Sequence, residues 1–114
     1  MTVSIAFANA SLDASLVGTY YVALTVGGVE VSGSAYARTA VTWAASTSGH
    51  KKNNADVVFP RATGGAWGSI DGWALFSAST GGTALFTGVV SPSVVIADGT
   101  QFTFVTGSVD VTLT

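Results

Sequence analysis

The sequence predicts an all-β domain, built as an antiparallel β-sandwich or small barrel of about eight short strands. Short runs rich in Val, Thr, Phe, Tyr and Ile alternate with turns that contain Gly, Ser, Asn or Asp. Apolar residues do not recur at helical spacing over any long, capped stretch. The length of 114 residues is typical of one domain. We therefore expect residues 1–114 to form a single β-sandwich domain.

Residues 1–18 are interpreted as an N-terminal docking arm or a strand. Residues 2–7 alternate and place Val3, Ile5 and Phe7 on one face, which favours a strand. Residues 10–16 are the best helical segment of the chain, but about two turns of helix are marginal without tertiary support.

The first half of the chain shows four further strand patterns with identifiable ends. Gly27-Gly28 forms a turn between two of them, which is a hairpin signal. Pro60 ends another, because proline cannot donate a hydrogen bond to a sheet and favours an edge or a strand end. The predicted strands are residues 20–26, 29–31, 35–44 and 57–59.

The second half has clearer strand signals. Its first strand is almost wholly apolar, which predicts burial on both faces. Turns are expected at residues 78–82 and 97–100, where Gly99 can take a positive φ at little cost. The predicted strands are residues 69–77, 83–90, 94–96, 101–105 and 108–114.

The composition favours assembly and excludes several classes of protein. Charged residues are only 9% of the chain, against an average of about 25%, and sparse charge suits a surface covered by neighbouring subunits. The net charge of −2 argues against sequence-independent nucleic-acid binding. No apolar run is long enough for a membrane span, and no cysteine is present for disulfides or thiolate metal sites. We expect no nucleic-acid partner and no membrane partner.

The chemistry-bearing residues are too few and too scattered for an enzyme. His50 is the only histidine and lies in a polar segment that predicts a loop. The six acidic residues occur singly, so the sequence gives no sign of paired acid–base catalysis. Asp71 alone interrupts an apolar strand, where it either faces solvent or pairs with a buried partner. We predict no catalytic residues, no metal site and no cofactor.

Five residues are candidates for docking a partner. All four basic residues fall between positions 38 and 61 with one acid, Asp56, among them. This pattern indicates either a solvated loop or a basic patch that docks on an acidic neighbour. Trp73 is expected in the core. Trp67 lies between Gly65 and Gly68 and is expected at the surface. The candidates are Arg38, Lys51, Lys52, Arg61 and Trp67.

From about Thr19 to the C-terminus, the chain resembles a family of small bacteriophage virion proteins that are usually labelled tail fibre proteins. The order of the motifs carries the resemblance. The N-terminus departs from the family, because members often begin with a short amphipathic helix and residues 1–18 look more strand-like here. The similar segments are residues 33–42, Phe59-Pro60, 67–76, 78–82, 85–88, 98–100 and 102–104.

The resemblance implies a virion component without enzymatic activity. Two sites in the particle fit such a protein. A compact domain without shaft repeats favours a capsid decoration or cement protein, a homotrimer on the capsid surface that contacts the major capsid protein and copies of itself. The alternative is a tail or neck fibre component that binds a host surface glycan, with Trp67 exposed for this purpose. In either case the protein is made in the host cytoplasm.

Overall fold

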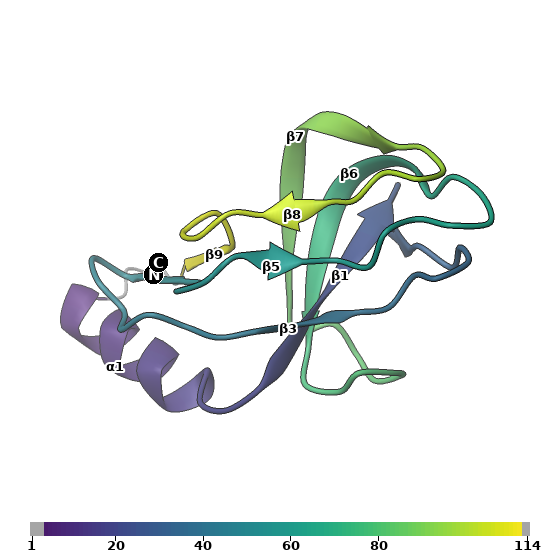
Figure 1. Cartoon of the computed structure of the whole chain (residues 1–114). Coiled ribbons are helices and arrows are strands. Elements are labelled where there is room, and N and C mark those ends of the chain that lie inside the picture. The colour runs from purple at the N-terminus through teal and green to yellow at the C-terminus, as the bar shows by residue number, and fades with distance from the viewer. Residues whose placement is uncertain (1–3, 113–114) are drawn as a thin grey trace.

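The computed structural model describes residues 4–112, which form antiparallel β-sheets and one N-terminal helix (Figure 1). About 41% of the chain is strand, and the sheets of the described residues do not close into a barrel. The all-β prediction is thus confirmed for the antiparallel sheets, whereas the barrel alternative is wrong. The N-terminal helix departs from an all-β fold and overlaps residues 10–16, the segment with the best helical pattern. The elements are α1 (Ile5–Ser15), β1 (Tyr20–Val26), β2 (Val29–Glu30), β3 (Thr39–Val41), β4 (His50–Lys52), β5 (Val57–Val58), β6 (Gly68–Phe76), β7 (Phe86–Ile96), β8 (Thr103–Phe104) and β9 (Asp110–Thr112).

The largest sheet has the strand order β2-β1-β6-β7 and is called the main sheet below. Strand β3 also pairs with β1, so β2 and β3 share one edge of β1 at its two ends. Thr25 pairs with Glu30 at one end, and Tyr21 pairs with Ala40 at the other. Between them the Leu24 amide donates to the Tyr36 hydroxyl at 3.1 Å, so a side chain completes this edge.

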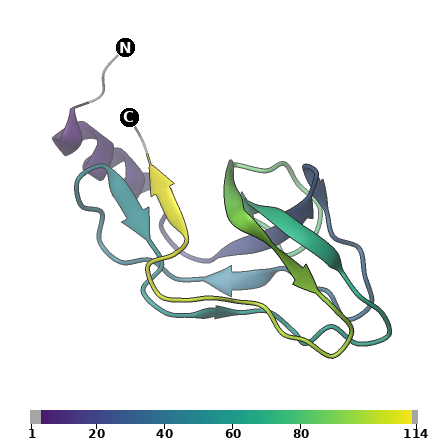
Figure 2. The same ribbon diagram turned by 90° about the horizontal axis from the view of Figure 1, so that it is seen from above.

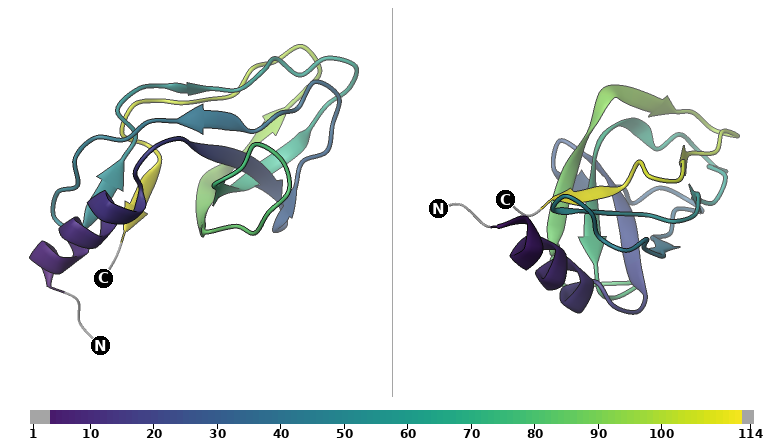
Figure 3. Two further views of the ribbon diagram at one scale, coloured as in Figure 1. Left: turned by 90° about the horizontal axis from the view of Figure 1, so that it is seen from below. Right: turned by 90° about the vertical axis from the view of Figure 1, so that its left-hand side faces the viewer.

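Two small sheets cover one face and one end of the main sheet. Strand β5 pairs with β8, and β4 pairs with β9. Figure 2 shows β5 and β8 beside the main sheet, and α1 at the far end of the molecule next to β4 and β9. The molecule measures 46 × 26 × 25 Å, and the left view of Figure 3 shows α1 at one end and the main sheet in the other half.

The core lies between the main sheet and the covering strands. Val22 and Leu24 of β1 face it, as does Leu75 of β6, and all three are fully buried. From the opposite side the rings of Phe102 and Phe104 meet edge to face, with their centroids 4.8 Å apart. Such aromatic pairs add about 0.5–1.5 kcal/mol to the free energy gained by burying their area.

The predicted strand over residues 2–7 is wrong from Ile5 onward, and residues 1–3 lie outside the described part of the chain. Helix α1 begins after Ser4, whose hydroxyl accepts a hydrogen bond from the Phe7 amide at 3.2 Å. Tertiary packing decides the outcome, because Ala8 and Leu12 are buried four residues apart on one helical face. Local alternation alone could not reveal that packing.

Most of the remaining strands lie where the sequence predicts them, but several differ from the prediction in length. Strand β1 matches its predicted bounds, and β6 differs by one residue at each end. Strand β7 is continuous through Pro92, where two shorter strands were expected. Strand β4 was missed, because the polar residues around His50 are typical of a loop.

One close approach inside the main sheet yields a prediction about stability. Gly88 of β7 pairs with Trp73 of β6, and a Cβ at position 88 would lie 2.1 Å from the indole Nε1. Gly88→Ala should therefore lower the free energy of unfolding by about 1–3 kcal/mol, because the buried indole has to move. Urea denaturation measures this loss. The neighbouring exposed variant Thr87→Ala serves as the control and should change stability by no more than about 0.5 kcal/mol.

Candidate functional site

The outer face of the main sheet, which points away from the core, is hollowed into a groove of about 600 Å³. Side chains on this face alternate with the core-facing ones, and Ala23, Ala74 and Phe76 form a small apolar cluster separate from the core. We call this hollow the outer groove. Its lining includes Thr25, Glu30, Asp71, Phe76, Thr87 and Val89.

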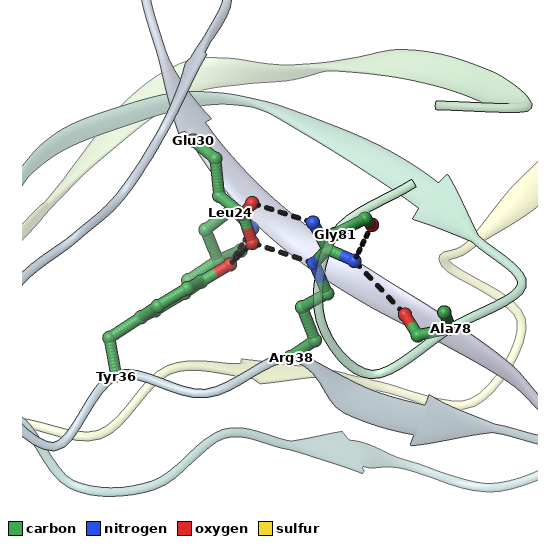
Figure 4. Close-up of polar contacts among 6 residues, drawn as sticks. All are labelled: Leu24, Glu30, Tyr36, Arg38, Ala78 and Gly81. Atoms are coloured by element: carbon green, nitrogen blue, oxygen red, sulfur yellow. Dashed lines mark hydrogen bonds and ion pairs between the residues drawn. The ribbon is translucent and has the colours of Figure 1, made fainter. Parts of the chain in front are cut away.

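Arg38 forms a bidentate ion pair beside the outer groove (Figure 4). Its Nε and Nη2 donate to the two carboxylate oxygens of Glu30, each at 2.9 Å. The Arg38 side chain is only 7% exposed and that of Glu30 30% exposed. This fork geometry needs arginine, because a lysine ammonium cannot present two parallel donors.

The same guanidinium also holds the loop between β6 and β7. Its Nη1 donates to the carbonyl oxygens of Ala78 and Gly81 at 3.0 and 2.7 Å (Figure 4). Its carbon Cζ lies 3.6 Å from the centroid of the Phe76 ring, in a cation–π contact. Arg38 therefore fixes the loop over Phe76 at one end of the outer groove.

Tyr36 is the third side chain in this group of polar contacts, beside Arg38 and Glu30. Its hydroxyl donates to the Glu30 carboxylate at 2.8 Å while it accepts from the Leu24 amide. Burial raises the pKa of the Tyr36 phenol well above its ordinary value, and the Glu30 charge raises it further. The phenol therefore remains neutral and keeps its proton for Glu30.

The charges of the pair stabilise one another. The hydrogen bonds from Arg38 lower the pKa of Glu30 below its ordinary value, burial opposes this, and the Tyr36 hydroxyl adds to the lowering. The hydrogen bonds to Glu30 raise the pKa of Arg38 in turn. We define Glu30, Tyr36 and Arg38 as the Arg38 cluster.

The four basic residues do not form one surface patch in the structure. The Arg38 side chain bonds groups within the fold, as described above, and the Lys51 side chain is also buried and paired within the molecule. The Lys51 side chain is 8% exposed, and its ammonium bonds to Asp13 of α1 at 2.5 Å. That hydrogen bond lowers the pKa of Asp13. Both cations thus hold the fold together, so the surface patch drawn from the sequence is wrong at these two positions.

The other three docking candidates divide between surface and interior. Lys52 is exposed on β4. Arg61 is exposed and donates to the Gly99 carbonyl oxygen at 2.7 Å. Trp67 was expected at the surface but is only 6% exposed, because its indole donates to the Ser34 carbonyl oxygen and packs edge-on against Tyr36.

Two further residues singled out in the sequence have clear structural roles. His50 pairs with Asp110 across β4 and β9 at 2.9 Å, in a strand rather than the expected loop. Asp71 faces solvent at a bulge in β6, where its carboxylate accepts a hydrogen bond from the Gly27 amide at 3.1 Å. It thereby anchors the β1–β2 turn beside the outer groove.

The outer groove itself was missed in the sequence. Its residues come from β1, β2, β6 and β7, and only the strand pairing brings them together. The one available signal was Gly72 within an apolar strand, since such a glycine often marks a close approach. A Cβ at Gly72 would lie 2.5 Å from the Thr25 hydroxyl oxygen.

Residues 4–112 contain no group of three or more side chains suited to holding a metal ion. In the same part of the chain no helix is long and apolar enough to cross a membrane. The outer groove instead combines carboxylates, hydroxyls and apolar side chains on paired strands, an arrangement suited to binding.

Comparison with models of protein families identifies a family that this chain matches. The family model described as podophage GP4 fiber I protein gp80 matches residues 22–112, which run from β1 to the end of β9. Helix α1 precedes the matched segment. No curated protein matches the chain.

The Arg38 cluster predicts a specific effect of removing the fork. Arg38→Lys keeps the charge but loses most of the four hydrogen bonds, so the free energy of unfolding should fall by about 1–3 kcal/mol. Hydrogen exchange of the amides at residues 78–82 should quicken as their loop loosens. Arg61→Lys is the matched control, because that exposed arginine also bonds a carbonyl. Equal effects of the two substitutions would contradict this role of Arg38.

The lowered pKa of Glu30 predicts a dependence of stability on pH. Because the folded state binds this proton less tightly than the unfolded state, the stabilisation is present at neutral pH. It is lost as the pH falls below the ordinary range of a glutamate and through the folded pKa. Urea denaturation at pH 7 and pH 3 should show that Glu30→Gln destabilises the protein at pH 7 and much less at pH 3. A deficit of the same size at both values would rule out the ion pair as its source.

Proposed function

The chain belongs to the podophage GP4 fiber I protein family, and we propose that it is a tail or neck fibre component that contacts the host surface. The match over residues 22–112 is the observation that carries this proposal, because it covers all of the described strands except the first two residues of β1. The family is one of phage fibre structural proteins and is non-enzymatic. The resemblance to virion proteins and the expectation of no enzymatic activity are thus confirmed.

The capsid cement reading is corrected by the same match. The family places the chain among virion fibre components, which favours the alternative that the sequence left open. Compactness and the lack of shaft repeats had favoured cement, but neither property distinguishes a capsid-bound domain from one unit of a fibre. The major capsid protein is therefore no longer the partner that we propose.

The shape of the molecule supports contact with the host at one end. The outer groove is lined by strands of the main sheet, which lies in the other half of the molecule from α1 (Figure 3). Its walls are mostly hydrogen-bonded strands of the main sheet, and the Arg38 cluster lies at its rim. A rigid groove loses little conformational entropy on binding.

The α1 end supports contact with other copies of this chain within the fibre. Ile5 and Phe7 of α1 are 61% and 65% exposed, and Val17 just after the helix is 68% exposed. The only charged residue of α1, Asp13, is neutralised by Lys51. Two copies that meet through α1 would therefore bury apolar side chains without like-charge repulsion.

A cryo-EM reconstruction of the whole particle tests the proposed function. We expect density for this chain in tail or neck fibres, with neighbouring copies in contact through α1. Purified protein should also compete with the intact phage for adsorption to host cells. Density at local threefold axes of the capsid, together with no competition, would overturn the proposal.

A further inference from the structure

We propose that the outer groove is a binding site for a neutral oligosaccharide of the host surface. This inference rests on the proposed function and adds to it the site and the chemical class of the ligand. The evidence is the size of the outer groove, its charge, its unpaired hydroxyls and its apolar floor.

The size of the outer groove fits a short oligosaccharide. Its volume of about 600 Å³ falls within the range of roughly 300–1,000 Å³ found for small-molecule sites. Gly72 lies in the lining between Thr25 and Val89, its pairing partners on β1 and β7. Because Gly72 has no side chain, the Thr25 hydroxyl can lie directly over this part of the floor.

The charge of the outer groove excludes anionic ligands. Its ionisable side chains are the carboxylates of Glu30 and Asp71, and no lysine or arginine contributes to its lining among residues 4–112. Both carboxylate oxygens of Glu30 already accept hydrogen bonds from Arg38, and one of them also accepts from Tyr36. Asp71 accepts only the Gly27 amide, so its carboxylate retains free acceptor positions for ligand hydroxyls.

Hydroxyl groups supply the remaining polar contacts. Among residues 4–112 none of the hydroxyls of Thr25, Thr87, Ser91 and Ser93, all in the lining, has a hydrogen-bond partner within the protein. Each can act both as a donor and as an acceptor. A ligand that carries many hydroxyls can satisfy such a set, whereas an apolar ligand would leave it unpaired.

The apolar part of the lining completes the match to a sugar. Val89 is 79% exposed and offers carbon surface beside these hydroxyls, whereas Ala74 and Phe76 are buried beneath the lining. A pyranose ring presents C–H groups on its faces and hydroxyls around its rim. It can therefore lie over the carbon surface while its rim meets Asp71 and the hydroxyls.

Two variants of one strand provide a matched test. Val89→Trp places an indole in the outer groove, while Val95→Trp puts the same side chain at a 66% exposed position of β7 that is outside the lining. Both native side chains are exposed, so both variants should fold, and circular dichroism with thermal unfolding verifies this. Asp71→Asn tests the carboxylate and keeps one oxygen to accept the Gly27 amide.

Saturation-transfer difference NMR and titration calorimetry give the readout. The probes are neutral disaccharides of glucose, galactose, mannose and N-acetylglucosamine, polysaccharide from the host envelope, and a glucuronate disaccharide as the anionic control. We expect saturable binding of a neutral probe, at least tenfold weaker with Val89→Trp, several-fold weaker with Asp71→Asn and within twofold of wild type with Val95→Trp. The glucuronate probe should not bind.

Several results would overturn the inference. These are no binding of any neutral probe, preference for the glucuronate probe, or equal binding by wild type and Val89→Trp. If wild type and Val89→Trp block phage adsorption equally well, the groove assignment fails while the fibre function stands. If wild type does not block adsorption and its density lies on the capsid, the proposed function fails instead. Binding of a peptide or a second copy in the outer groove, with no glycan bound, would also refute the assignment.

Discussion

Arg38 connects parts of the chain that are far apart in the sequence. Its guanidinium joins Glu30 on β2, the carbonyls of the loop after β6, and the face of the Phe76 ring. Satisfying a nearly buried guanidinium requires all of these partners, since an unpaired charge of this kind is costly. The β2 edge, the loop and the outer face of the main sheet therefore hold their relative positions together.

Local patterns were sufficient where one strand carries its own signal. Strand β1 has apolar residues on both faces and is bounded by Gly27-Gly28, so its limits could be read directly. Strand β6 combines an almost continuous apolar run with turn residues on both sides. Burial on both faces and turn chemistry are properties of consecutive residues, which is why they were predictable.

Tertiary contacts decided the cases in which prediction was wrong. Helix α1 forms because Asn9 and Asp13 bond the segment before β4, a contact that alternation over residues 2–7 cannot show. Trp67 has glycine and alanine neighbours, which favour exposure, yet its indole is buried and donates a hydrogen bond to the Ser34 carbonyl oxygen. Arg38 was selected as a docking candidate, but its guanidinium bonds groups within the fold, and sequence spacing carries no information on these partners.

The arrangement of α1 and β1 has a mechanical consequence for a protein in a fibre. Strand β1 follows α1 closely, begins beside the end of β6 and runs away from α1 along the main sheet (Figure 1). Residues Tyr21–Thr25 of β1 are hydrogen-bonded to β6 through five consecutive pairs, Tyr21↔Phe76 to Thr25↔Gly72. A pulling force directed along β1 acts across these hydrogen bonds, which lie perpendicular to the strand. The bonds are then loaded in shear and share the tension, so the β1–β6 pair resists pulling along the strands better than it resists peeling from an edge.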